Sequence, residues 1–319
     1  MPNTHAANEL RLIRVYNASV SQVWEAWTDP AQVAQWWGPR GFTLTHISKD
    51  LRAGGEWAYT MHGPDGVDYP NRTHYLDVEK HVRLVYDHGA NDKQPPMFRV
   101  TVHFKESDGK TTMDMTMAFS SAQAAQEAKK FIRLAGGETT WDRLAEFLAK
   151  KVSGKNLFVI NRTFSAPIDQ IFSVWTKPEH FSQWLAPTGF QMEFLEAEIK
   201  SGGSTFYSMG NGAGVKMFGR AKYLEVKSPD RIVYTQQFCD EKGGISRHPM
   251  APTWPETMLT TVTLASEAPD QTRVTIAWEP HGHVTSEELE TFIQARAGMT
   301  QGWTGSFEKL DEYLLKLQG

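Results

Sequence analysis

Apolar and polar residues alternate in several segments of the chain, which is typical of antiparallel strands with one buried face. Trp57, Tyr59 and Met61 occupy every second position of one such segment. Residues 98–104 and 112–117 follow the same pattern further along the chain. These segments therefore predict a sheet that turns aromatic and methionine side chains toward an interior.

Helical spacing, with apolar residues three and four positions apart, appears on either side of these strands. A strand over residues 10–17 is followed by a short helix over residues 21–28, which Pro30 ends. Residues 121–151 keep the helical spacing over a much longer stretch, and we expect this helix to bend at Gly136–Gly137. The order of strand, short helices, antiparallel strands and long helix predicts an α+β module.

The whole pattern occurs twice, with matching positions 148 residues apart and no gap between Arg14 and Tyr86 of the first copy. The sequence WTDP at 27–30 recurs as WTKP at 175–178, and Trp36 recurs as Trp184. Such self-similarity indicates tandem copies of one domain. We therefore divide the chain into an N-terminal tail (1–9), a first domain (10–152), a short linker (153–156) and a second domain (157–319).

The second copy differs from the first in one long insertion, roughly residues 239–254, which is rich in Gly, Pro and His. Its prolines cannot serve a central strand, so we expect a poorly ordered connection between neighbouring strands. The helix after it should begin with Thr285 or Ser286 as N-cap and run to about Leu317.

Composition narrows the possible partners and the compartment. Lys and Arg number 33 against 37 Asp and Glu, which gives a formal net charge of -4 with no basic arm. Binding to nucleic acid or to an anionic membrane is therefore not expected, and no apolar stretch is long enough for membrane insertion. Cys239 is the only cysteine, so no intrachain disulfide can form, and we expect a cytoplasmic protein.

Several short segments together resemble one known family: WTDP at 27–30, WWGP at 36–39, GGEW at 54–57, and YLEV at 223–226 followed by RIVY at 231–234. They are similar to the activator-of-heat-shock-protein-ATPase-like branch of the START/SRPBCC superfamily, over nearly the whole chain and twice. The resemblance implies two tandem helix-grip domains, each a curved antiparallel sheet wrapped around a long C-terminal helix, with two short helices after the first strand. It also implies a cavity between sheet and helix that holds an apolar ligand in many relatives.

The inward positions of the predicted strands and helix provide the candidate ligand-binding residues. In the first copy these are Trp57, Tyr59, Met61, Met113, Met115 and Met117, and in the second copy Tyr207, Met209, Tyr234, Trp278 and Trp303. The same side chains could equally form an ordinary core. We expect the larger cavity in the first copy, because Trp303 takes the place of one glycine of the Gly136–Gly137 pair and should fill space in the second.

The histidines do not form a convincing metal or catalytic pattern. His281 and His283 lie in a segment expected to be a loop, whereas zinc needs three or four convergent ligands. Alternation places His103 and Asp114 on the outer face of the sheet, and His74 has no better claim to acid-base chemistry. We therefore predict no metal, no cofactor and no catalytic residue.

Three functions fit these observations. The first is a non-catalytic protein that binds a hydrophobic or aromatic small molecule in its cavity. The second, implied by the family's name, is a co-chaperone-like module that binds a heat-shock-protein ATPase. The third is an enzyme of cyclase or hydrolase type that acts inside the same cavity.

Overall fold

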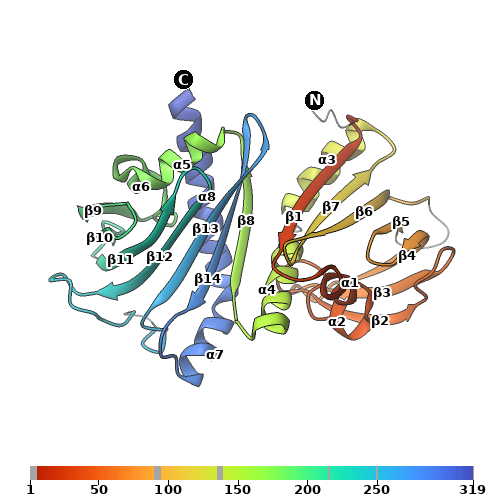
Figure 1. The fold of residues 1–319 in the computed structure, drawn as a ribbon, viewed down its shortest axis with the longest axis horizontal. Coiled ribbons are helices and arrows are strands. Elements are labelled where there is room, and N and C mark those ends of the chain that lie inside the picture. Colours follow the sequence, from red (N-terminus) through yellow and green to blue (C-terminus); the bar gives the residue numbers. More distant parts are fainter. Residues whose placement is uncertain (1–5, 90–94, 135–138, 215, 249–250, 319) are drawn as a thin grey trace. The chain divides into compact units, whose positions relative to one another are not determined.

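The computed structural model describes residues 6–89, 95–134, 139–214, 216–248 and 251–318. The chain forms two compact units, Met1–Lys155 and Asn156–Gly319, which we call the first and second modules. Each contains a seven-stranded antiparallel sheet and its own helices (Figure 1). The prediction of two tandem helix-grip domains is confirmed.

The sheet of the first module has the strand order β1-β7-β6-β5-β4-β3-β2. Two short helices follow its first strand, as the sequence predicts. The elements are β1 (Glu9–Tyr16), α1 (Val20–Thr28), α2 (Pro30–Val33), β2 (Thr43–Lys49), β3 (Glu56–His62), β4 (Asp68–Glu79), β5 (Arg83–Gly89), β6 (Phe98–Ser107), β7 (Lys110–Ala118), α3 (Ala122–Leu134) and α4 (Thr139–Ser153).

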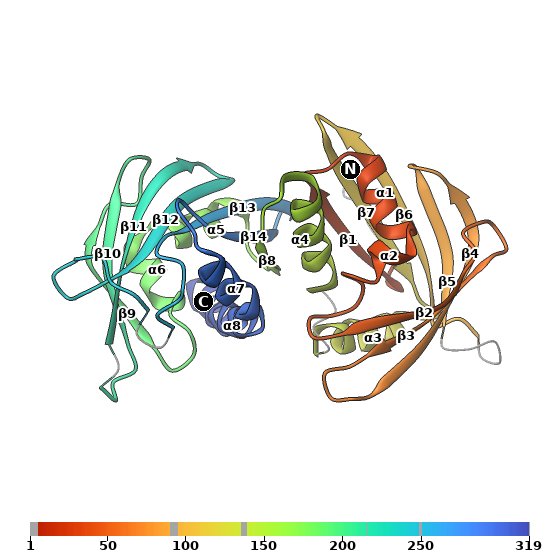
Figure 2. The same ribbon diagram turned by 90° about the horizontal axis from the view of Figure 1, so that it is seen from below.

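The second module repeats this arrangement with the strand order β8-β14-β13-β12-β11-β10-β9. Figure 2 shows the strands of this sheet curving around α8. The elements are β8 (Phe158–Phe164), α5 (Ile168–Thr176), α6 (Pro178–Trp184), β9 (Gln191–Ala197), β10 (Ser204–Gly210), β11 (Lys216–Lys227), β12 (Arg231–Cys239), β13 (Met258–Ala268), β14 (Gln271–Pro280), α7 (Ser286–Gln294) and α8 (Arg296–Gln318).

The repeated proline and tryptophan of the two copies have one structural explanation. In α1 the carbonyl of Ala26 would normally accept a hydrogen bond from the amide four residues on, but that residue is Pro30, which has no N–H. The indole of Trp36 supplies the missing donor, with its Nε1 2.9 Å from the Ala26 oxygen. The motif therefore ends one helix and satisfies its buried carbonyl.

The second module uses the same device at matching positions. The Val174 carbonyl of α5 precedes Pro178 by four residues, and Trp184 Nε1 donates to it at 3.0 Å. Both Trp36 and Trp184 are fully buried. The two tryptophans occupy equivalent places, as the 148-residue repeat predicts.

The helical segment at the end of the second module differs from the prediction of one long helix. In the second module the helix expected from Thr285 to about Leu317 is divided into α7 and α8 at Ala295, whose ψ of -5° leaves the helical path. Thr285 is the N-cap, in a capping box with Glu288. In the first module the described helical residues form α3 and α4, and the Gly136–Gly137 pair lies outside the described residues.

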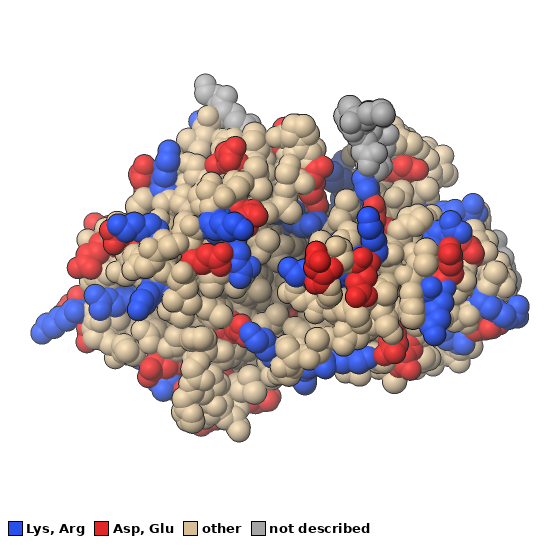
Figure 3. Space-filling view, viewed as in Figure 1, with Lys and Arg blue, Asp and Glu red and all other residues tan. Residues whose placement is uncertain are grey.

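Charge is mixed over the molecular surface. Figure 3 shows Lys and Arg side chains interspersed with Asp and Glu over the face in view. None of the described helices is long and apolar enough to cross a membrane.

Candidate functional site

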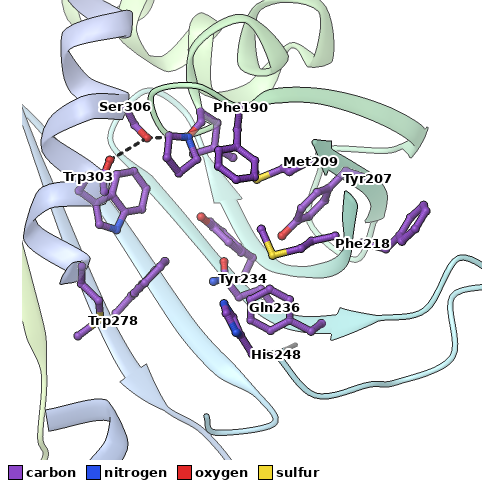
Figure 4. Close-up of a pocket in the computed structure, with 16 residues that line it drawn as sticks. Phe190, Tyr207, Met209, Phe218, Tyr234, Gln236, His248, Trp278, Trp303 and Ser306 are labelled. Atoms are coloured by element: carbon purple, nitrogen blue, oxygen red, sulfur yellow. Dashed lines mark hydrogen bonds between the residues drawn. The ribbon is translucent and has the colours of Figure 1, made fainter. Parts of the chain in front are cut away.

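An apolar pocket of about 270 Å³ lies in the second module, between the inner face of the sheet and α8 (Figure 4). Strands β10, β11, β12 and β14 form one wall, α8 forms the other, and the connection between α6 and β9 closes one end. The apolar lining residues are Leu185, Pro187, Phe190, Met209, Met217, Phe218, Phe238, Trp278, Met299, Gly302 and Trp303. The polar ones are Tyr207, Tyr234, Gln236, His248 and Ser306.

The pocket exists because several inward positions carry small residues. Tyr207 pairs with Gly219 across β10 and β11, and a Cβ atom at Gly219 would lie 2.4 Å from the tyrosine ring. The next inward pair, Thr205 and Ala221, is also small. On the facing helix, a Cβ atom added at Gly302 would meet nothing within 4 Å. Space is therefore left between sheet and helix.

The titratable groups that line the pocket are uncharged at neutral pH. Burial raises the pKa of Tyr207 to about 12 and also raises the pKa of Tyr234. Burial lowers the pKa of His248 below its ordinary value, so its imidazole is neutral at pH 7. Figure 4 shows Tyr234 and Gln236 projecting from the sheet toward the space beside Trp303.

Two indole rings form the end of the pocket next to α8. Trp278 and Trp303 meet edge to face, with ring centroids 5.6 Å apart. The Nε1 atoms of both rings are buried and have no hydrogen-bond partner among the described residues. Buried donors usually find a partner, so these two are available to an acceptor that enters the pocket.

The connection between β12 and β13 brings His248 to the pocket, and contacts with α7 hold that connection in place. Arg247 forms an ion pair with Glu288 at 2.6 Å, and Thr253 shares a hydrogen bond with Thr291 at 2.9 Å. The sequence predicts a connection between neighbouring strands here, which the structure shows. The sequence also predicts a poorly ordered segment, whereas the described part of the connection is anchored by these specific contacts.

Comparisons with known proteins place the fold in a family. The model of the family described as Activator of Hsp90 ATPase homolog 1-like protein matches residues 17–149 and, separately, residues 165–315. The chain belongs to this family. Among curated proteins, no relative matches the chain.

Similar solved structures include single-module proteins and one with two domains. A protein from Staphylococcus epidermidis is 27% identical over 51% of this chain and 91% of its own, with a TM-score of 0.41. A protein from Mycobacterium smegmatis is 26% identical over 46% of this chain and 96% of its own, with a TM-score of 0.42. The di-domain ARO/CYC BexL from the BE-7585A biosynthetic pathway is 10% identical over 96% and 98% of the two chains, with a TM-score of 0.39.

In the second module, the structure brings all the sequence-predicted residues into one pocket. Tyr207, Met209, Tyr234, Trp278 and Trp303 all line it. The ring of Trp303 forms part of the pocket wall, and the expectation that it takes up space that the first copy leaves open stays a prediction.

In the first module of this family member, the corresponding residues pack in the core. Trp57, Tyr59, Met113 and Met115 are buried, whereas Met61 and Met117 are half-buried beside them. Trp57 stacks on Tyr59 with ring centroids 4.1 Å apart. Their role in ligand binding stays a prediction.

Among the described residues, the apolar pocket beside Tyr207, Tyr234 and Trp278 lies in the second module, and the expectation of a larger cavity in the first module stays a prediction. Two exchanges between the copies bear on the space in each: Trp37 and Trp57, which contact each other at 5.2 Å between centroids, correspond to Leu185 and Thr205. The glycine pair on which the expectation rested lies outside the described residues.

Sequence reasoning missed Gln236 and His248 as pocket residues. Gln236 continues the inward alternation of β12 two residues after Tyr234, so the alternation could have found it. His248 lies on a connection with no periodic pattern, and only the fold brings it to the pocket. Among the described residues, no group of three or more His, Cys, Asp and Glu side chains is placed to bind a metal ion.

Lys49 of the first module provides a test of the packing around Trp57. Its Nζ donates to the Trp27 carbonyl at 3.0 Å and lies 4.1 Å from the centre of the Trp57 ring. Burial lowers the pKa of Lys49 to about 7, and Asp29 only partly opposes this shift. Between about pH 7 and the ordinary lysine pKa, the unfolded chain therefore binds a proton that the folded chain lacks, so stability from this group rises with pH.

We expect Lys49→Met to raise the melting temperature above that of the unchanged protein. The rise should be largest below pH 7. This relative gain should shrink toward pH 10, because the unfolded lysine then loses its proton too. Melting temperatures measured from pH 6 to pH 10 check this. Lys110→Met, at an exposed position, serves as control and should show no such trend; an equal response of both variants would contradict burial of the Lys49 amine.

Proposed function

We propose that the second module binds a small apolar molecule in the pocket between its sheet and α8, without transforming it chemically. The observation that carries the proposal is the pocket itself: about 270 Å³, walled by aromatic rings, methionines and a helix glycine, with a few polar groups. Sites for small molecules commonly have such walls, and their volumes begin at about 300 Å³. This volume therefore suits a compact ligand of a few rings.

The chemistry of the lining residues supports binding rather than catalysis. The described lining includes no carboxylate and no amine, so neither a charged nucleophile nor a charged acid faces the space. Tyr207 and Tyr234 hold their protons far above neutral pH because they are buried. A general acid or base works best with a pKa near the working pH, which neither tyrosine has.

Thermal denaturation of the full-length protein with naphthalene, a compact two-ring hydrocarbon, tests the proposal. A ligand that binds only the folded state at about 100 times its Kd stabilises it by about 2.7 kcal/mol. For a module of this size that corresponds to a rise in melting temperature of about 5–10 °C. A saturable rise is expected, and no rise for any compact aromatic ligand in a broader panel would refute the proposal.

A further inference from the structure

The pocket is uncharged as well as apolar, and this limits what it can hold. Among its described lining residues there is no Lys, Arg, Asp or Glu. The residues of this module that lie outside the described ranges are Val215, Pro249, Met250 and Gly319, and none has a charged side chain. A charged ligand group would lose its hydration without gaining a counter-ion, which is costly.

The pocket nevertheless contains hydrogen-bonding groups that are not used within the protein. The Gln236 amide and the Tyr207 hydroxyl line the pocket, and neither forms a hydrogen bond with another described residue. Both come from inward positions on strands of the same sheet, where their cross-strand partners are the small residues Gly219 and Ala221. A purely apolar ligand would cover these groups and leave them unsatisfied, at a cost in affinity.

The indole at the other side of the pocket adds a second, independent observation. Trp303 is more than nine-tenths buried, and its Nε1 has no partner among the described residues. The Nε1 atom of Trp278 is also buried and also has no partner among them. An indole N–H can only donate, so it requires an acceptor. An oxygen atom of a ligand meets this requirement without any charge.

We infer that the ligand is an uncharged ring compound that carries a hydroxyl or ketone oxygen, with Gln236 as the main hydrogen-bonding residue. The inference rests on the proposed function, since it names the chemical class of molecule for the same pocket. It excludes fatty acids, organic phosphates and other anions as preferred ligands. Lys216, Asp240 and Arg247 line a neighbouring hollow that shares Met217, Phe218 and Phe238 with the pocket, but none of these three charged residues lines the pocket itself.

Calorimetric titration of the full-length protein with three matched two-ring compounds tests this inference. Naphthalene has no polar group, 2-naphthol adds a hydroxyl that is neutral at pH 7, and 2-naphthoate adds a negative charge. We expect 2-naphthol to bind about ten-fold more tightly than naphthalene, because it satisfies groups that the hydrocarbon leaves unpaired. We expect 2-naphthoate to bind more weakly than either neutral compound.

A pair of neighbouring glutamines gives matched variants. Gln236→Leu keeps the approximate side-chain size but removes the amide, and it should abolish most of the preference for 2-naphthol, because naphthalene then covers no unpaired amide and binds more tightly. Gln237→Leu is the control. Gln237 is the next residue of β12 and does not line the pocket, and its amide donates a hydrogen bond of 2.8 Å to the Thr257 hydroxyl. This variant should keep the full preference.

The outcomes separate the two proposals. If naphthalene and 2-naphthol bind equally, or if 2-naphthoate binds as tightly as 2-naphthol, the inference about ligand class is wrong although the binding function stands. The assignment of Gln236 is overturned if Gln236→Leu and Gln237→Leu retain the same preference. If none of the compounds binds, the proposed function fails in its simplest form and the inference falls with it.

Discussion

Gly302→Leu is expected to raise the melting temperature of the protein while weakening the binding of a compact apolar ligand by about 10- to 100-fold. Gly302 lies within α8 and lines the pocket, and a Cβ atom added there would meet nothing within 4 Å. Leucine forms helices better than glycine by roughly 0.5–1 kcal/mol, so the folded state should gain stability. The same side chain occupies the space that the ligand needs.

The opposite signs of the two effects make this variant informative. A substitution that damaged the fold would lower both stability and binding, whereas filling a pocket lowers binding alone. Thermal denaturation and calorimetric titration with 2-naphthol, both on the full-length chain, measure the two quantities. Unchanged affinity for the ligand would show that it does not enter this space.

Gly298→Leu is the matched control on the same helix. Gly298 is exposed, a Cβ atom added there would also meet nothing within 4 Å, and Gly298 does not line the pocket. We expect a similar gain in helix stability without any loss of binding. Equal loss of affinity in both variants would mean that α8 itself, rather than the filled pocket, governs binding.

Trp184→Ala is expected to destabilise the protein by about 3–5 kcal/mol, because it removes a fully buried aromatic side chain. Trp184→Phe should cost about 1–3 kcal/mol, since the ring volume is largely kept but the Val174 carbonyl loses its donor. That carbonyl has no replacement within the helix, because Pro178 stands where the next N–H would be. Urea denaturation followed by circular dichroism measures both losses.

The first module supplies an internal comparison for this result. Trp36→Phe removes the corresponding hydrogen bond to Ala26, ahead of Pro30, and should cost a similar amount. Trp254→Phe is the control, because Trp254 is only partly buried against the core. If Trp184→Phe is no more harmful than Trp254→Phe, the indole hydrogen bond does not stabilise the helix end as we argue.

The sequence by itself determined the architecture of each module and the face on which the candidate residues lie. Alternation along a strand decides which side of the sheet each side chain occupies, so the sequence alone assigns Tyr207, Tyr234 and Trp278 to the interior. The position of Pro30 determines where α1 must end, and its repetition at Pro178 identifies the second copy. These features depend on backbone chemistry and short spacings, which can be recognised without knowledge of long-range contacts.

Only the tertiary structure decided where the pocket lies and which polar groups it contains. A pocket is the space that remains where side chains from strands and helices far apart in sequence do not fill the interior. No local sequence pattern shows how much space remains. Thr205 and Leu185 are smaller than the tryptophans at the matching positions of the first module, so they leave room. Gly219 makes space for Tyr207 because the two residues pair across neighbouring strands. His248 reaches the same space because the neighbouring Arg247 binds Glu288 of α7 and so holds the connection between β12 and β13 in place. Arg247 and Glu288 are 41 positions apart in the sequence.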